Sequence, residues 1–187
     1  MGTEIPAVTA RRAGVVLLAA MLTLTGAACK SQRSRVTVQN EENPPASPQL
    51  ASTVRMGDPA AASQLLSGFS AIENNTWRWT GEKFSVKLRT PPAAVNGATI
   101  ALSFTIPDVI IQNLKKIQLT VSAGGTYLKS QEYNMAGTYV FSADVPAGPL
   151  LQADAIAVDY AVDKTYSAPG DIRKLAVVAN SVSINPK

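Results

Sequence analysis

Histidine is absent from this chain of 187 residues, and cysteine occurs once, at Cys29. Without an imidazole base, Ser-His-Asp and Cys-His catalytic arrangements and most zinc sites are excluded. A single cysteine excludes a disulfide within the chain. No glycine-rich stretch has the spacing of a phosphate-binding loop. Two carboxylates could still act as acid and base, but nothing in the spacing of the acidic residues selects a pair. We therefore predict that the protein is not an enzyme.

Charge is also sparse. The 17 basic and 13 acidic residues give a formal net charge of +4, and the basic residues are scattered along the chain. Removing residues 1–29 takes away two basic residues and one acidic residue, which leaves an excess of three positive charges. Nucleic-acid binding requires a clustered basic surface. We therefore expect no nucleic-acid partner.

The first 29 residues are typical of an export signal. Arg11 and Arg12 place positive charge ahead of an apolar stretch over residues 13–28. That stretch is shorter than the ~20 apolar residues of a membrane-spanning helix, and it ends in small residues. Residues 1–29 are therefore predicted to be a signal peptide.

Cys29 directly follows this stretch, in the sequence LTGAACK. Ala27, Ala28 and Cys29 resemble the lipobox of a bacterial lipoprotein, although Gly26 stands where that family prefers leucine. The resemblance implies a lipid anchor on Cys29 and a place in the cell envelope outside the cytoplasm, on the periplasmic or outer-membrane side. Gly26 and Ala28 also fit ordinary signal-peptidase cleavage, which would give a secreted protein. An uncleaved anchor is the third alternative.

Residues 30–56 are rich in Ser, Gln, Asn, Pro and charge and contain no aromatic residue. Such a composition cannot bury enough apolar area to offset its conformational entropy. We predict a disordered linker over 30–56 and one folded domain over 57–187.

Within 57–187, apolar and polar residues alternate with a period of two. In residues 98–106, for example, every second residue from Ile100 to Ile106 is apolar. This alternation is typical of strands with one buried and one solvated face. The predicted strands cover residues 84–90, 98–106, 116–123, 138–145, 155–163 and 175–185.

Turn residues separate these runs, and Gly124-Gly125 favours a tight hairpin. Only residues 58–68 have the pattern of a helix of any length, with Asp58 as its cap and Pro59 at its first position. The expected fold is therefore all-β, an antiparallel, jelly-roll-like β-sandwich.

Two short stretches also carry a resemblance to a known family. GFSAIENNTWRWTGEKFSVKL (68–88) contains Gly68-Phe69, Glu73 and Arg78-Trp79-Thr80-Gly81, and TYSAPGDIRKLAVVANSVSI (165–184) contains Tyr166, Pro169, Asp171, Arg173 and Leu175, with Ala176 where glycine is more usual. They resemble the carbohydrate-binding-module-like, galactose-binding-type domain of cell-envelope polysaccharide proteins. The resemblance implies a jelly-roll-like sandwich and a non-catalytic role with glycans.

Trp77 and Trp79 are the only tryptophans of the chain. Residues two apart on a strand share a face, so both indoles could form one surface for a sugar. Burial of an indole is strongly favourable, and Trp79 lies within the Arg-Trp-Thr-Gly motif, so we predict that Trp79 is a core anchor. Trp77 is the predicted ligand contact, together with Tyr166. Tyr127 and Tyr133 are weaker candidates.

Two pairs of charged residues within the resembling stretches are interpreted as structural ion pairs. Asp171 and Arg173 lie two residues apart, so their side chains can form an ion pair that holds a loop. Glu73 and Arg78 are expected to hold the first hairpin in the same way.

No cofactor is predicted. Calcium is an alternative, because Asp154, Asp159 and Asp163 lie close in sequence and carboxylates bind this ion, although no set of ligands can be named. The predicted partners are a membrane, through the lipid anchor, and an envelope or extracellular polysaccharide. The alternative is an assembly lipoprotein that docks on an envelope protein.

Overall fold

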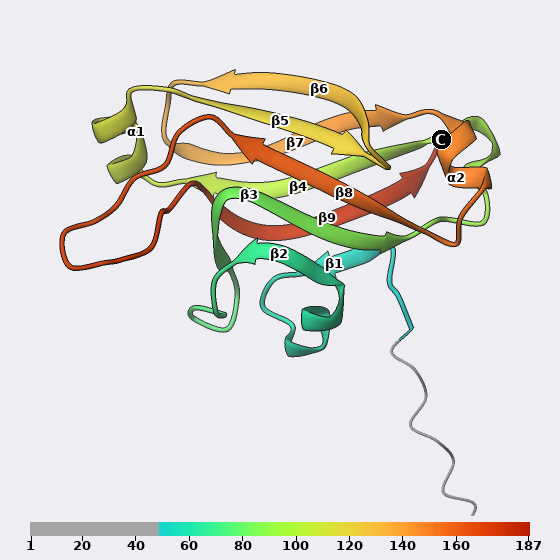
Figure 1. The fold of residues 1–187 in the computed structure, drawn as a ribbon, viewed down its shortest axis with the longest axis horizontal. Helices are drawn as coiled ribbons and strands as arrows, with labels where there is room; N and C mark the ends of the chain where they lie inside the picture. Colours follow the sequence, from blue (N-terminus) through green and yellow to red (C-terminus); the bar gives the residue numbers. More distant parts are fainter. Residues whose placement is uncertain (1–48) are drawn as a thin grey trace, which may run out of the picture. The chain divides into compact units, whose positions relative to one another are not determined.

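The computed structural model describes residues 49–187. The predicted signal peptide, Cys29 and the first part of the predicted linker lie outside these residues. The described part contains nine strands and short helices (Figure 1). The strands are β1 (Thr53–Arg55), β2 (Leu65–Phe69), β3 (Arg78–Arg89), β4 (Ala98–Ile106), β5 (Ile117–Ala123), β6 (Thr126–Tyr133), β7 (Gly137–Val145), β8 (Ala155–Val162) and β9 (Val178–Pro186). The helices are η1 (Pro59–Gln64), η2 (Ala94–Asn96), α1 (Asp108–Leu114) and α2 (Ala147–Leu151).

All strand pairs are antiparallel, and they form two packed layers. The first sheet joins β1, β9, β4 and β7 with the start of β3. The second sheet has the order β6-β5-β8-β3-β2. This arrangement confirms the predicted all-β, antiparallel, jelly-roll-like sandwich.

Strand β3 belongs to both sheets. Its residues Arg78 and Trp79 pair with Ala179 and Val178 of β9, whereas the segment from Lys83 to Arg89 pairs with β8. At the corner between these two parts, the Thr80 amide donates to the Val177 carbonyl at 2.8 Å. The Thr80 hydroxyl, which is buried, donates to the same carbonyl at 3.2 Å. Such corners allow one strand to pass from one sheet to the other.

The core lies between the sheets and consists of the inward-facing residues of the alternating strands. Phe84 of β3 stacks on Tyr160 of β8, with ring centroids 4.9 Å apart, and Phe69 of β2 packs edge-on against Phe84. Burial raises the pKa of Tyr160 and raises that of Tyr133 to about 12. Aromatic contacts therefore join three neighbouring strands on the inward face of the second sheet.

The alternation pattern predicted six of the nine strands. Four of them lie within one residue of the predicted ranges, whereas β3 begins at Arg78 and not at residue 84, and β9 begins at Val178 and not at residue 175. Strand β6 was not predicted. The folded domain also begins earlier than Gly57. Strand β1 lies inside the segment predicted as linker, pairs with β9, and has Val54 and Met56 buried around it. The linker prediction failed there because three residues are too few to show alternation.

The helix predicted over 58–68 is wrong in its second half. Asp58 caps the 3₁₀-helix η1 by accepting a hydrogen bond from the Ala60 amide, and Pro59 begins it, but the chain then continues as strand β2. Leu65 and Phe69 pack against the core, which outweighs local helix preference. Helices α1 and α2 were not predicted, because each is shorter than two turns. No helix within residues 49–187 is both long and apolar enough to cross a membrane.

The edge strands β6 and β7 belong to different sheets and follow each other in the chain. Lys129 of β6 reaches across to β7. Its ammonium donates to the Ser142 carbonyl at 3.1 Å and lies 5.1 Å from the centre of the Phe141 ring. This side chain therefore joins the two edges of the sandwich.

Strand β2 depends on Gly68, whose φ is +78°. A Cβ there would lie 2.0 Å from the Lys83 carbonyl oxygen and 2.7 Å from the Phe84 Cα. We expect Gly68→Ala to lower the free energy of unfolding by about 3 kcal/mol or more, because backbone strain adds to a clash with β3. Gly125→Ala is the matched control, since its φ is +79° and nothing lies within 4 Å. Gly125→Ala should lower the free energy of unfolding by only about 1–2 kcal/mol, because the backbone strain is present without a clash. Urea unfolding measures both values, and an equal loss of unfolding free energy in Gly68→Ala and Gly125→Ala would contradict this account.

Candidate functional site

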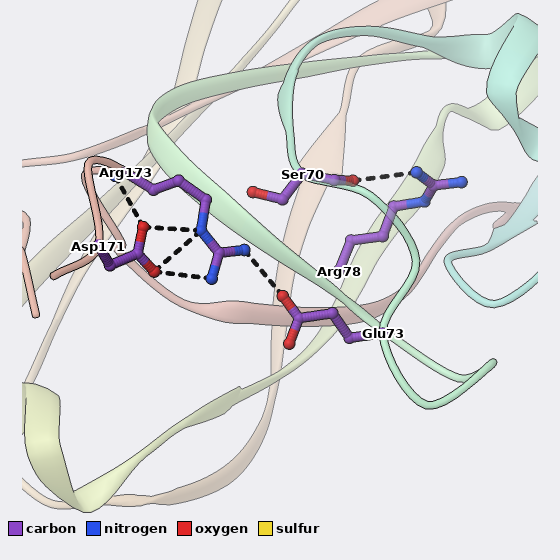
Figure 2. A network of polar contacts seen from close by, with 5 residues as sticks. All are labelled: Ser70, Glu73, Arg78, Asp171 and Arg173. Carbon is purple, nitrogen blue, oxygen red and sulfur yellow. Dashed lines mark hydrogen bonds and ion pairs between the residues drawn. The ribbon is translucent and has the colours of Figure 1, made fainter.

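Arg173 lies at the centre of an ion-pair cluster that joins two loops (Figure 2). Its guanidinium donates to both carboxylate oxygens of Asp171, with Nη2 2.7 Å from Oδ2 and Nε 3.0 Å from each oxygen. Its Nη1 donates to Glu73 Oε1 at 2.8 Å. The Arg173 cluster, which consists of these three residues, connects the loop before β9 to the turn before β3. The structure thus brings Asp171 and Arg173 together.

The expected pair between Glu73 and Arg78 does not form. Arg78 donates through Nε to the Met56 carbonyl and through Nη1 to the Ser70 carbonyl, both at 3.0 Å. The positions of the two side chains explain why they do not pair. Arg78 already begins β3 and lies beside the segments that follow β1 and β2, whereas Glu73 extends toward Arg173 (Figure 2). The sequence interval between Glu73 and Arg173 is 100 residues, so no local pattern could indicate their contact.

The electrostatics of the cluster favour a structural role. The Arg173 guanidinium, hydrogen-bonded to Asp171, lowers the pKa of that carboxyl below its ordinary value. The two carboxylates in turn raise the pKa of Arg173. A glycosidase acid needs a raised pKa and faces its substrate. Asp171 and Glu73 instead face the same cation, so the cluster holds the loops and does not form an acid–base pair.

The two tryptophans pack against each other at nearly a right angle. Their ring centroids are 6.2 Å apart with an interplanar angle of 87°, and both side chains are half-buried. Trp79 also packs against the core. The indoles therefore do not form one flat surface for a sugar, although Trp77 keeps part of its ring accessible.

The remaining aromatic candidates lie in different environments. Tyr166 is half-buried, packs against the core and exchanges two backbone hydrogen bonds with Leu175, each 2.8 Å long. Tyr133 lies within the core, with 5% of its surface exposed, which removes it as a ligand contact. Tyr127 is 62% exposed at the start of β6. Trp77 and Tyr166 are held on separate segments.

The outer face of the second sheet carries a row of polar residues. The cross-strand register aligns Ser67, Ser85, Asp159, Ser122 and Tyr127, one from each of β2, β3, β8, β5 and β6. Directly opposite residues on neighbouring strands project from the same side. The Ser85 hydroxyl donates to Asp159 Oδ1 at 2.5 Å. The row therefore crosses the whole sheet on the side away from the core.

Four members of this row, Ser67, Ser85, Asp159 and Ser122, line a groove of about 370 Å³. Most of the side chains that project into it are small or hydroxylated. We call this surface the groove face. Its outward positions are Ser67, Lys83, Ser85, Lys87, Arg89, Gln118, Thr120, Ser122, Ala155, Ala157, Asp159 and Ala161.

Sequence reasoning missed the groove face. Each strand showed which residues point outward, but the strand order that places β8 between β3 and β5 is not encoded in any single strand.

A second, larger hollow of about 880 Å³ lies at one end of the sandwich, beside α2. Arg89, Thr90 and Asp154 contribute polar groups to it, and Pro91, Pro92 and Leu150 contribute apolar ones. We call it the end groove. Because Arg89 is also an outward residue of β3, the end groove adjoins the groove face.

The three aspartates considered for calcium are engaged separately. Asp159 accepts from Ser85, Asp163 accepts from the Gln118 amide at 2.6 Å, and Asp154 lines the end groove. In the described part of the chain, no three His, Cys, Asp or Glu side chains gather to form a metal site. The structure therefore assigns no ligand set to an ion.

Comparisons with known proteins found no matching family model and no matching curated protein. Among solved structures, the CBM36-1 domain of a multidomain xylanase from the hindgut metagenome of Trinervitermes trinervoides is 11% identical with a TM-score of 0.42, over 72% of this chain and 96% of that domain. A family 35 carbohydrate-binding module from an environmental isolate is 12% identical with a TM-score of 0.36, over 74% and 87% of the two chains. CBM35 from Paenibacillus barcinonensis is 8% identical with a TM-score of 0.34, over 74% and 92%. At these values the likeness carries no argument about the ligand of this chain.

The Arg173 cluster makes a pH-dependent contribution to stability. Because the pKa of Asp171 is lowered in the folded state, the contribution is complete above the ordinary pKa of an aspartate, about 3.9, and is lost as the pH falls through the lowered value. We expect Arg173→Met to raise the pKa of Asp171 toward its ordinary value in an NMR titration of the carboxyl carbon. Arg173→Lys, which keeps the charge, should raise it less. An unchanged Asp171 pKa in Arg173→Met would contradict the assignment.

Proposed function

We propose that this protein is a non-catalytic carbohydrate-binding protein that binds an envelope or extracellular polysaccharide on its groove face. The observation that supports the proposal is the row of polar residues from Ser67 to Tyr127, which crosses five strands and lines a groove with four of its five members. The volume of about 370 Å³ falls within the range of sites that bind small molecules or parts of polymers.

The chemistry of the row suits a polyhydroxylated ligand. The Ser122 hydroxyl can donate and accept, and the Asp159 carboxylate accepts only. A sugar presents hydroxyl groups that need both kinds of partner. Neighbouring strands are about 4.8 Å apart, so the five positions of the row extend over roughly 19 Å. Several sugar hydroxyls could therefore be bonded at once, with small neighbours such as Ala157 and Ala161 leaving room for the rings.

The carboxylates of the described residues support a role without catalysis. Glycoside hydrolysis requires two carboxyl groups on either side of the scissile bond. Asp159 is the only carboxylate among the outward positions of β3, β8 and β5 on the groove face. Glu73 and Asp171 converge, but on the guanidinium of Arg173. Binding is therefore the chemistry that the groove face can perform.

Docking on a protein partner is the alternative function, and the exposure of the Ile172 side chain favours it. Its side chain is 100% exposed between two members of the Arg173 cluster, so a firmly held loop presents an apolar group. Other exposed apolar side chains lie on separate elements, such as Leu66 on β2, Val140 on β7 and Leu151 on α2. A protein interface needs a contiguous apolar patch, so we favour the polysaccharide.

The binding proposal is tested by filling the groove. Ala161→Phe places a phenyl ring on the groove face and is expected to weaken binding to a panel of envelope polysaccharides at least tenfold, because the ring occupies space that the sugars need. Ala101→Phe is the matched control, since Ala101 projects outward from β4 on the other sheet. Calorimetry measures the affinities, and thermal unfolding checks that both variants fold.

The same assay tests the aromatic contacts predicted from the sequence. Loss of binding in Trp77→Ala or Tyr166→Ala, with full binding in Ala161→Phe, would place the site beside the Arg173 cluster and contradict the groove proposal. Absence of binding to every polysaccharide tested would leave the protein-partner alternative.

We further propose that a lipid on Cys29 holds the domain at the cell envelope. The support for this is the apolar stretch over 13–28 and the small residues before Cys29. In bacterial cells, Cys29→Ser is expected to abolish incorporation of a labelled fatty acid and to move the protein from the membrane fraction to the soluble fraction. Several acyl chains, at ~0.8 kcal/mol per buried CH₂, account for stable anchoring of the unsubstituted protein. Equal labelling of both proteins would contradict the anchor.

A further inference from the structure

We propose that the polysaccharide bound by the groove face is anionic and carries carboxylate groups; this inference rests on the proposed function. The observation that supports this inference is a line of cations on β3. Lys83, Lys87 and Arg89 all project outward and are exposed, while Phe84, Val86 and Leu88 between them are buried. Residues two apart on a strand are about 7 Å apart, so the line extends over roughly 20 Å from Lys83 to Arg89.

On the neighbouring strand β8, the residues directly opposite these cations carry no charge, and Asp159 is the diagonal neighbour of both Lys83 and Lys87. In the register between β3 and β8, Lys83 lies opposite Ala161, Lys87 opposite Ala157 and Arg89 opposite Ala155. Each charged side chain therefore has a methyl group as its cross-strand neighbour. The ion pairs found within residues 49–187 involve other cations, namely Lys116, Lys164, Arg173 and Lys187.

The acidic groups nearby do not balance the line. Two exposed or partly exposed carboxylates lie beside the line. Asp159 of β8 accepts a hydrogen bond from Ser85, and Glu82 of β3 directly precedes Lys83. Glu132 of β6 is paired with Lys116, with 2.7 Å between the Lys116 Nζ and the Glu132 Oε2. Asp154 lies in the end groove together with Arg89. With Lys83, Lys87 and Arg89 against Glu82 and Asp159, this part of the groove face keeps a small excess of positive charge, and Lys87 is the cation with an uncharged residue on either side of it in β3 and directly opposite it.

The line also connects the two hollows of the surface. Lys83 lines the groove over the polar row, Arg89 lines the end groove, and Lys87 lies between them on the same strand. A polymer that lies along β3 would meet a cation in each hollow and one between them. Regularly spaced carboxylates on such a polymer would supply counter-ions in addition to Asp159, the one carboxylate that β8 contributes to this face.

The groove face also lacks what a neutral sugar would use. Among its outward positions on β2, β3, β8 and β5 there is no aromatic side chain, and Tyr127 lies at the far edge of the sheet on β6. Stacking on an aromatic ring contributes apolar contact area to a ligand. The groove face presents hydroxyl groups and cations where such a ring would lie. Its affinity for a ligand must therefore come from hydrogen bonds and charge.

The test compares two polymers of equal length, polygalacturonate and neutral galactan. We expect the purified protein to bind polygalacturonate at least tenfold more tightly at low ionic strength. The preference should shrink at 0.5 M salt, because exposed charges are then screened over a few ångströms. The double variant Lys83→Gln/Lys87→Gln should lose the preference. Arg55→Gln/Lys174→Gln removes the same charge from exposed positions outside the groove face and should keep it.

The outcomes separate this inference from the proposed function. Equal affinity for both polymers, or a preference that survives in Lys83→Gln/Lys87→Gln, would overturn the anionic ligand and leave polysaccharide binding intact. Binding of neither polymer, at low or high salt, would overturn both. Single-stranded DNA of matched charge serves as a third probe. If it bound as tightly as polygalacturonate, the cations would act as a general ion exchanger and the inference would fail.

Discussion

The passage of strand β3 from one sheet to the other is the constraint on which the rest of the structure depends. Its corner is fixed by the hydrogen bonds between Thr80 and Val177. A slip of one residue in the pairing with β8 would turn every side chain of β3 to the opposite face. Phe84 would then leave the core and Lys83 would enter it. The same register therefore sets both the hydrophobic core and the charges of the groove face.

Local patterns predicted the parts of the fold that a single segment can specify. Strands such as β4 alternate for nine residues, which is long enough for the period of two to be evident. Strand β1 has three residues, and α1 and α2 are shorter than two turns, so none of the three carries a recognisable period. Residues 65–68 of β2 were assigned to a helix because their local preference is ambiguous, and the pairing of β2 with β3 decided the outcome.

The contacts of the candidate sites also divide into those that local spacing indicates and those that depend on the folded chain. Asp171 and Arg173 are two residues apart, so their contact could be anticipated from spacing, whereas Glu73 reaches Arg173 only through the folded chain. The Arg-Trp-Thr-Gly stretch has a physical explanation for three of its residues. Arg78 bonds two backbone carbonyls, Trp79 packs against the core, and Thr80 forms the corner of β3. The groove face needed the order of five strands, which no motif contains.

Lys129 has a consequence for how copies of this protein behave when they are crowded together. The exposed edges of β6 and β7 offer unpaired backbone groups, which are the usual starting point for aggregation by strand addition. The Lys129 ammonium occupies one such acceptor, the Ser142 carbonyl, and places a charge between the two edges. An incoming strand would have to displace this charge and leave it without a partner. A charged side chain at a sheet edge is one of the features by which β-proteins oppose strand addition between copies, and Lys129 lies at such a position.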